Sequence, residues 1–564
     1  MPCPHHNDTG RPTDIINLSQ LDHTKSECHV EEGTCQLCQE LLVAEKDVET
    51  AIAQLKTALN RRQRLKTNIN VTHCVHIIRD LPIEILTRIF YSCFSEEMQD
   101  YGEPVYEDAF VPLKVGAVCR TWRQIVWSSP QFWTVISMKR LLSSASHVFN
   151  QYVVMEGWVE RSGVLPLHVY ITEEAVEDRE VELNANVSMV PEECQCWERC
   201  LRLLEKFCDR WEVASLNLSL QSFEYIADNL NLKAPTRRLT FGSPQTRWYR
   251  MLDQDYNALN LRGSHTAPEE ITLNFPVRLD HLSINWHNVA HVEVHEWPLE
   301  ECVNLLRHAP RLESCSFIRA GRFTPVGMQT LHGGPFIEVT NHSLRYLYME
   351  CEDSPAIFFD EVTLPSLEEL DFSYSHGGFF PDDAVRSTFL REFIARSCCP
   401  LTTLSLPIPP FTPVDYLDSV LQLLPSLVHL TLHFSASFSR EDQRKALDHF
   451  LSHLVTTASI EDNDFLPHLE ELELGYSGFR EVSHWKAIAD AIGVDPSTEL
   501  GTRREGRRPF RSVVVGVFKP LPVKGVPRDV VDRLRSLQEA GAVIDFRVGF
   551  EYGSYRGRVP AKWE

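Results

Sequence analysis

Cysteine and histidine residues near the start of the chain are the first candidates for chemistry. The stretch ECHVEEGTCQLC contains Cys28, His29, Cys35 and Cys38, and thiolates and imidazoles are the ligands that zinc prefers. A structural zinc site normally takes two well-spaced pairs of ligands, whereas only one C-x-x-C pair is present and Cys28 directly adjoins His29. The spacing therefore favours a metal-free tail, and we expect no metal here.

A second group of histidines lies in the stretch HVEVH at residues 291–295. On a helix, His287, His291 and His295 would share one face and resemble a metal site. Val292 and Val294 alternate with polar residues, however, and this period of two predicts a strand with outward-facing histidines.

Motifs that carry enzyme chemistry are absent from the sequence. It contains neither G-x-x-x-x-G-K-[ST] nor a G-x-G-x-x-G that opens a helix. The runs LHGGPF and SHGGFF resemble an oxyanion loop, but no G-x-S-x-G supplies a nucleophile, and GYSGF is one residue short. We interpret the HGG runs as turns after strands and expect neither catalysis nor a cofactor.

Composition limits the classes of partner. The 564 residues carry 55 Lys and Arg against 78 Asp and Glu, a net charge of −23, which argues against a nucleic-acid-binding surface. The arginines at 503, 504, 507 and 508 are expected to lie in a solvated loop. No window is apolar enough to span a membrane, and the first residues do not form a secretory signal. The 16 cysteines are therefore expected to be reduced in an intracellular protein, cytoplasmic or nuclear.

Helical patterns dominate the first part of the chain. Residues 37–67 contain no Gly or Pro, and Leu41, Val48 and Leu55 recur every seven residues, which predicts a helix that either packs on the next domain or pairs weakly with another helix. Pro82 begins a second amphipathic helix. Helical spacing then extends from Pro112 to Val126, and the stretch 128–130 stops it; Trp133 is expected to fold back over this region as a lid.

The residues of these helices resemble the F-box family. The pattern L-P-x-E-I-L-x-x-I-F at residues 81–90, then V-C-x-x-W at 118–122, then F-W at 132–133 matches the family's motif, with a longer and more acidic connecting loop. The resemblance covers residues 77–137 and is similar to fungal F-box-like proteins. It implies that a Skp-type adaptor binds Leu81, Pro82, Ile85, Leu86, Ile89, Phe90, Val118, Cys119, Trp122 and Ile125, some of which also serve the small core.

A recurring phrase, x-L-x-x-[LC]-x-apolar, occupies the rest of the chain. It appears in RLDHLSI, RLESCSF, SLRYLYM, SLEELDF, PLTTLSL, SLVHLTL and HLEELEL, at unequal intervals, with helical patterns between most of the copies. A strand, a turn and a helix in each unit resemble a leucine-rich-repeat solenoid, although the asparagine of the standard repeat is missing from most units. We therefore expect an α plus α/β fold, with a small helical F-box domain followed by an irregular leucine-rich-repeat solenoid.

This interpretation divides the chain into five parts. We expect a disordered tail (1–36), a helix with a short coiled-coil pattern (37–70), the F-box domain (74–140), a linker and entry to the repeats (141–204), and the solenoid with a closing unit (205–564). Aromatic residues after the expected strands would align along one rim and bind a target, unless they fold inward over the sheet ends. The set is Phe323, Tyr374, Phe379, Phe380, Phe411, Tyr476 and Phe479.

The resemblance implies a substrate-recognition subunit of a Skp–cullin–F-box ubiquitin ligase. The F-box would bind the adaptor, and through it cullin and RING subunits, while the repeats would hold a protein substrate of unknown identity. An alternative is a non-degradative scaffold that uses both regions only for binding. A hydrolase within the repeats would need a nucleophile–base pair, which the sequence does not reveal.

Overall fold

The structure is a computed structural model that describes the greater part of the chain. The described residues are 35–79, 81–99, 111–140, 145–173, 191–219, 222–223, 225–226, 236–242, 267–277, 279, 282, 284–321, 338–352, 354–374, 388–408, 413–435, 440–457, 465–477, 485–491, 512–517, 528–539, 542–548 and 559–560.

The chain separates into two compact units, residues 1–88 and 89–564. The main element of the first unit is helix α1 (Gln36–Arg79), a single helix of 44 residues. It confirms the predicted helix and extends it, because no Gly or Pro interrupts the run. Helix α2 (Ile83–Gln99) begins at the predicted position after Pro82 and crosses the boundary between the units.

The second helix of the F-box-like motif is divided in two, which corrects the single helix expected from the apolar spacing. Helix α3 (Val111–Val118) ends before Cys119, and helix α4 (Arg120–Ser128) begins after it. Cys119 is extended, with φ −156° and ψ 171°, and its Sγ accepts a hydrogen bond from the backbone N–H of Trp122. The thiol thus caps α4, which a periodicity of apolar residues cannot reveal.

Trp133 folds back as expected, from the short 3₁₀ helix Pro130–Trp133. Its side chain is 1 % exposed, and its Nε1 donates to the carbonyl oxygen of Val126 over 2.9 Å. The rings of Trp127 and Trp158 lie edge-on to it, with centroids 5.1 Å and 5.5 Å away, and the guanidinium of Arg161 lies 5.2 Å from its ring centre. This aromatic cluster is a core with its polar group satisfied.

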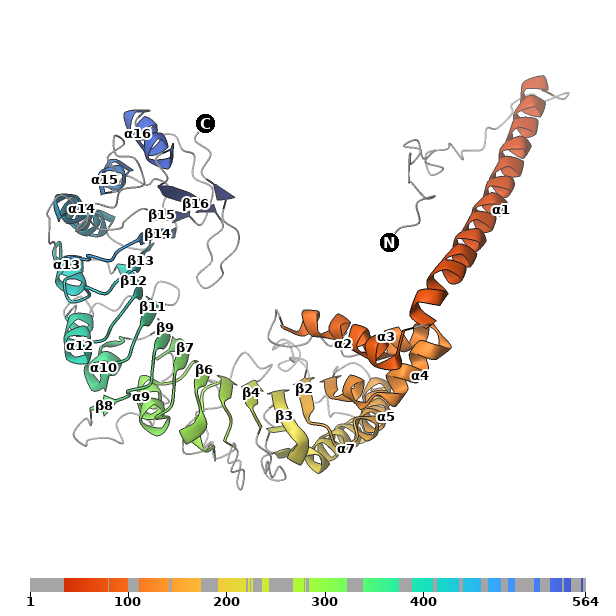
Figure 1. Cartoon of the computed structure of the whole chain (residues 1–564), viewed down its shortest axis with the longest axis horizontal. Helices are drawn as coiled ribbons and strands as arrows, with labels where there is room; N and C mark the ends of the chain where they lie inside the picture. The colour runs from red at the N-terminus through yellow and green to blue at the C-terminus, as the bar shows by residue number, and fades with distance from the viewer. Residues whose placement is uncertain are drawn as a thin grey trace. The chain divides into compact units, whose positions relative to one another are not determined.

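A long, open, mostly parallel sheet organises the second unit (Figure 1). Within the described residues, its fifteen strands lie in chain order, and only β17 is antiparallel to its neighbour; strands β8 (Val339–Thr340) and β10 (Val362–Thr363) pair separately. The main-sheet strands are β1 (Val135–Arg140), β2 (Leu167–Glu173), β3 (Trp211–Asn217), β4 (Arg238–Gly242), β5 (Glu270–Asn274), β6 (His291–His295), β7 (Ser314–Ala320), β9 (Tyr346–Cys351), β11 (Glu369–Tyr374), β12 (Thr403–Ile408), β13 (His429–Ser435), β14 (Glu471–Ser477), β15 (Ser512–Val517), β16 (Val543–Val548) and β17 (Val559–Pro560).

A helix lies between most pairs of successive strands in the described residues, and the helices from α9 onward lie on one side of the sheet (Figure 1). The two 3₁₀ turns Cys208–Arg210 and Trp286–Asn288 precede β3 and β6. The helices are α5 (Ala145–Arg161), α7 (Pro191–Lys206), α9 (Leu299–His308), α10 (Ala356–Glu361), α12 (Phe389–Ser397), α13 (Tyr416–Leu421), α14 (Arg440–Thr457), α15 (Trp485–Ala491) and α16 (Arg528–Glu539).

One apolar residue from each strand forms a continuous row on the side of the helices. Parallel pairing aligns the residues in register from strand to strand, and each is at most 2 % exposed. Since each of these side chains lies beside the equivalent residues of its two neighbours, an apolar residue must recur at the same place in successive strands. The row runs through Cys315, Leu347, Leu370, Leu404, Leu430 and Leu472.

A tight turn places the first leucine of the phrase. The N–H groups of Leu312, Leu367, Leu427 and Leu469 each donate to the carbonyl oxygen three residues earlier, over 3.2–3.3 Å. A proline follows each accepting residue, where its fixed φ favours a turn. The sequence L-P-x-L or A-P-x-L therefore marks the entry to these strands.

At the entry to β9, the side chain of Asn341 takes the place of this turn. Its side chain is 2 % exposed, and its Oδ1 accepts from the N–H groups of Ser343 and Leu344 over 3.0 Å and 3.1 Å. Its Nδ2 donates to the carbonyl oxygens of Leu306 and Ala309 over 3.1 Å and 3.0 Å. One amide thus satisfies backbone groups at the end of α9 and before β9, and it joins two successive repeats of strand and helix.

The phrase RLDHLSI at residues 278–284 lies between β5 and β6. Only Leu279, Leu282 and Ile284 of it are among the described residues, so the expected strand there stays a prediction. The start of the sheet differs from the expected division of the chain. Strand β1 already belongs to the sheet, and α5, β2 and α7 occupy the range expected to be a linker. The HVEVH stretch is confirmed as strand β6, with Val292 and Val294 buried.

The buried amide generates the first prediction. Asn341→Ala leaves two carbonyl oxygens and two N–H groups inside the protein without their partner, so we expect the free energy of unfolding to fall by about 2–4 kcal/mol. Denaturant unfolding, with hydrogen exchange in α9 and β9, measures the change. Asn304→Ala, at a half-exposed position on α9, is the control and should change stability little. Equal effects of the two substitutions would contradict the role of Asn341.

Candidate protein-interaction site

The motif residues predicted to bind an adaptor divide into exposed and buried side chains. Leu86, Phe90 and Ile125 are buried, at 5 % exposure or less, and therefore belong to the core. Leu81 and Trp122 are half-buried. The remaining motif residues are exposed: Pro82, Ile85, Ile89, Val118 and Cys119.

Two of the exposed apolar residues lie on the same face of helix α2. Ile85 and Ile89 are 44 % and 45 % exposed, and they are four residues apart, so they lie on the same face of α2. Phe90, one position further along, packs its ring 4.5 Å from that of Trp122. The core is therefore complete without the two isoleucines, and an exposed pair of β-branched residues indicates a surface that binds protein.

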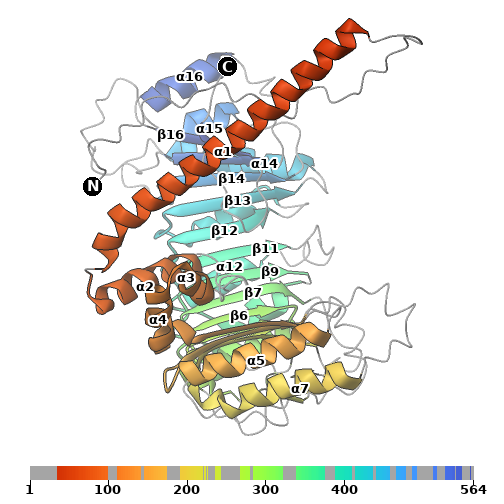
Figure 2. The same cartoon turned by 90° about the vertical axis from the view of Figure 1, so that its right-hand side faces the viewer.

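A second candidate surface is the face of the main sheet that points away from the leucine row. All-parallel sheets are normally covered on both faces. Here the helices from α9 onward lie on one side (Figure 1), and the strands from β6 to β14 lie side by side in Figure 2. Half-exposed or exposed residues on the other face include His291, Tyr346, Glu369 and His429. Among the described residues, no helix from α9 onward lies on this face, which we call the open face, although Ser405, His433 and Glu473 on it are buried.

The open face is strongly acidic between β6 and β14. At the strand positions that alternate with the buried row, no Lys or Arg occurs. Arg319 lies within an irregularity in β7, between Phe317 and Ala320, and pairs with Glu296 and Glu352 over 2.9 Å. Two tyrosines, Tyr346 and Tyr348, lie among the carboxylates. The acidic residues on this face are Glu293, Glu350, Glu369, Asp371, Glu471 and Glu473.

Burial changes the pKa of several groups on this face. It raises the pKa of Tyr348 to about 12, and Glu350 acts in the same direction. It also raises the pKa of the Asp371 carboxyl, against the opposing effect of a hydrogen bond from Ser405. Burial lowers the pKa of His433 to about 4, so this imidazole is neutral at physiological pH.

Ser405 and His433 form the closest approach to a nucleophile–base pair in the described residues. Ser405 Oγ lies 3.0 Å from His433 Nε2. A carboxylate only accepts hydrogen bonds, so with Asp371 ionised the single hydroxyl proton of Ser405 is donated to Asp371. In that state His433 Nε2 carries a proton and donates it to Ser405. The three side chains then form a hydrogen-bond chain across β11, β12 and β13.

Gly475 makes room for this chain. A Cβ atom at position 475 would lie 2.8 Å from His433 Nδ1. The glycine in the middle of β14 is therefore explained by the close approach of the imidazole from β13.

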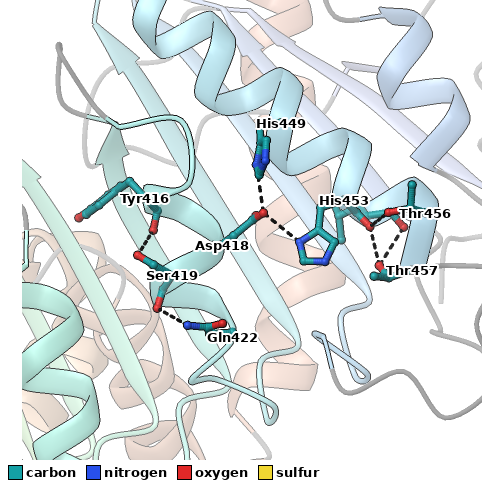
Figure 3. A network of polar contacts seen from close by, with 9 residues as sticks. Tyr416, Asp418, Ser419, Gln422, His449, His453, Thr456 and Thr457 are labelled. Atoms are coloured by element: carbon teal, nitrogen blue, oxygen red, sulfur yellow. Dashed lines mark hydrogen bonds and ion pairs between the residues drawn. The ribbon is translucent and has the colours of Figure 1, made fainter.

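Two further histidines meet a carboxylate between neighbouring helices (Figure 3). Asp418 of α13 accepts from His449 Nδ1 over 3.1 Å and from His453 Nδ1 over 2.9 Å, both on α14. The His453 ring stacks on Phe465 with centroids 4.2 Å apart. No group of His, Cys, Asp or Glu within the described part of the chain is arranged to hold a metal ion. We therefore interpret this contact as a link between the neighbouring helices α13 and α14.

The aromatic residues predicted to form a recognition rim are placed only in part. Tyr374 and Tyr476 lie inside strands β11 and β14, which corrects their expected position in loops. Tyr374 is half-buried, and its ring centroid is 5.1 Å from that of Phe372, a residue of the core. The other members of the set lie outside the described residues: Phe323, Phe379, Phe380, Phe411 and Phe479. Cys28 and His29 of the candidate zinc ligands also lie outside them.

The open acidic face was not recognised from the sequence, although the signal is present. Glutamate or aspartate follows the anchor leucine in the copies SLEELDF and HLEELEL, at positions that alternate with the leucines. Strand periodicity alone would have placed these carboxylates together on one face. Their accumulation across neighbouring strands becomes visible once the register is known.

No family model matches the chain, and a comparison with curated proteins finds no match. Within the described residues, no helix has the length and apolar character needed to cross a membrane.

The buried imidazole generates a prediction about pH. Because the pKa of His433 is about 4 in the folded chain against an ordinary value of 6.5, its contribution to stability is complete above pH 6.5 and is lost as the pH falls toward 4. This difference corresponds to about 3 kcal/mol. His433→Gln should therefore flatten the decline in the free energy of unfolding between pH 7 and pH 4.

Denaturant unfolding at several pH values checks this expectation. His429→Gln removes an exposed imidazole from the same strand and is the matched control. If both variants keep the full pH dependence of the wild type, the burial of His433 does not determine it.

Proposed function

We propose that this protein is a substrate-recognition subunit of a Skp–cullin–F-box ubiquitin ligase. The observation that carries the proposal is the division of the F-box-like motif. Leu86, Phe90 and Ile125 are buried, while Ile85, Ile89 and Val118 of the same motif remain exposed. A pattern that retains large apolar residues at the surface is typical of a docking site.

The target would bind the open face of the sheet. In this proposal the strands and helices form an irregular leucine-rich-repeat solenoid, supported by the order of the strands and the recurring leucines. The carboxylates on β6, β9, β11 and β14 favour a basic protein, and Tyr346 and Tyr348 supply aromatic contact area.

The contribution of the chain to ubiquitin transfer is positional. It forms and breaks no bond, and instead it holds a target beside the ubiquitin-loaded enzyme carried by the cullin and RING subunits. The gain is a high effective concentration of the target's lysines. No cofactor takes part in this role.

The adaptor contact generates a prediction. Ile85→Lys with Ile89→Lys places two charges in the proposed docking surface, and we expect binding of a Skp-type adaptor to weaken at least about a hundredfold. Both side chains are exposed in the chain, so the fold should persist. Purified adaptor and titration calorimetry measure the effect.

The matched control uses the same helix. Ile83→Lys with Thr87→Lys introduces the same charges at the same spacing, at positions outside the motif. Ubiquitin transfer to captured proteins should stop with the first variant and continue with the control. Unchanged adaptor binding by the first variant would overturn the proposal, and capture without any ubiquitin transfer by the wild type would favour the scaffold.

The open face generates a second prediction. Glu350→Lys with Glu369→Lys reverses two charges on neighbouring strands, and we expect capture of basic proteins to fall at least about tenfold while adaptor binding is unchanged. Quantitative mass spectrometry of co-purified proteins at low and high salt is the measurement. Glu300→Lys with Glu392→Lys changes the net charge equally on exposed positions of α9 and α12, and it should leave capture intact.

A further inference from the structure

Helix α1 presents a row of large apolar side chains that the described residues of its own unit leave about half exposed. The side chains of Leu41, Val48 and Leu55, seven residues apart, and of Leu59 and Leu65 are between 43 % and 52 % exposed. We call these five residues the apolar stripe. A helix in water gains most of its stability from packing of an apolar face, so a helix of 44 residues with an uncovered stripe requires a partner.

The stripe follows a heptad pattern of alternating large and small residues. Leu41, Val48 and Leu55 occupy one core position of successive heptads. The other core position is occupied by Ala44, Ala51, Ala58 and Leu65. Two such helices can approach closely if the large residues of one face the small residues of the other.

The charges of α1 are separated along its length. Residues 40–49 contain Glu40, Glu45, Asp47 and Glu49 with one lysine. Residues 56–66 contain only positive charges, at positions 56, 61, 62, 64 and 66. A parallel pair would place like charges side by side, whereas an antiparallel pair would place the acidic half of each helix against the basic half of the other.

We propose that α1 forms an antiparallel coiled coil with α1 of a second copy of this chain, and so makes the protein a homodimer. One register satisfies the side-chain sizes and the charges together. In it Leu41, Val48 and Leu55 face Leu65, Ala58 and Ala51 of the second copy.

The same register also accounts for the polar residue within the stripe. Arg62 falls at a core position opposite Ala44 of the second copy, where its aliphatic stem covers the small residue and its guanidinium reaches the acidic segment. Asp47 comes close to Arg61 of the second copy, and Glu45 comes close to Lys66. The paired segment, residues 41–65, extends for about 37 Å.

The proposal does not rest on the proposed function, because α1 lies outside the F-box-like motif and the sheet. The mass of the full chain in solution tests it, by light scattering or sedimentation over a range of concentrations. We expect a dimer of the 64.8 kDa chain, and Val48→Asp with Leu55→Asp should convert it to a monomer.

The matched control is Thr50→Asp with Thr57→Asp, which adds the same charges at the same spacing on another face of the helix and should remain dimeric. A wild type that is monomeric at every concentration overturns the proposal. It is equally overturned if the substitutions at positions 48 and 55 leave the dimer intact.

Oxidative cross-linking tests the orientation. Val48→Cys and Ala58→Cys chains, each prepared alone, should form no new disulfide, and an equimolar mixture should form one between positions 48 and 58. Wild type supplies the background from the native cysteines, and mass spectrometry of the linked peptides identifies the bond. A Val48→Cys chain that cross-links to itself at position 48 indicates parallel pairing, and a mixture that does not cross-link excludes the proposed register.

Discussion

The burial of one apolar residue from each strand against its two neighbours is the interaction on which the rest of the structure depends. Cys315, Leu347, Leu370, Leu404 and Leu430 occupy the same register position on successive strands and are almost completely buried. None of these strands could bury its leucine alone. The segments between strands can therefore vary in length, while the strand positions cannot.

The same alignment places polar residues together on the opposite face. Since side chains of a strand alternate, each buried leucine implies an outward residue beside it, and the register brings these residues into rows across the sheet. Asp371, Ser405 and His433 become hydrogen-bond partners in this way, with Gly475 providing space for the imidazole. The acidity of the face follows from the glutamates and aspartate of β6, β9, β11 and β14, and parallel pairing brings those of β9 and β11 side by side.

Helices α1 and α2 differ from the strands, because both keep large apolar side chains exposed. On α2, Phe90 packs on Trp122 while Ile89, one position earlier, stays exposed. On α1, the large apolar side chains of the stripe are exposed in the chain by itself. If the proposed pairing of α1 holds, each assembly carries two open faces, and two weak contacts with one target would act as a much stronger one.

The sequence by itself determined the elements whose signals are local. Alternation of valines predicted β6, the phrase x-L-x-x-[LC]-x-apolar predicted strands β7, β9 and β11 to β14, and the absence of Gly and Pro predicted α1. Tertiary structure decided which stretches pair, since β2 and β5 lack the phrase and belong to the sheet. Cys119 divides a run with unbroken helical spacing because its thiol caps α4. Periodicity reports which side of an element is apolar. The pairing of a strand depends on burial against neighbours distant in sequence, and the break between α3 and α4 depends on a side-chain cap that periodicity does not detect.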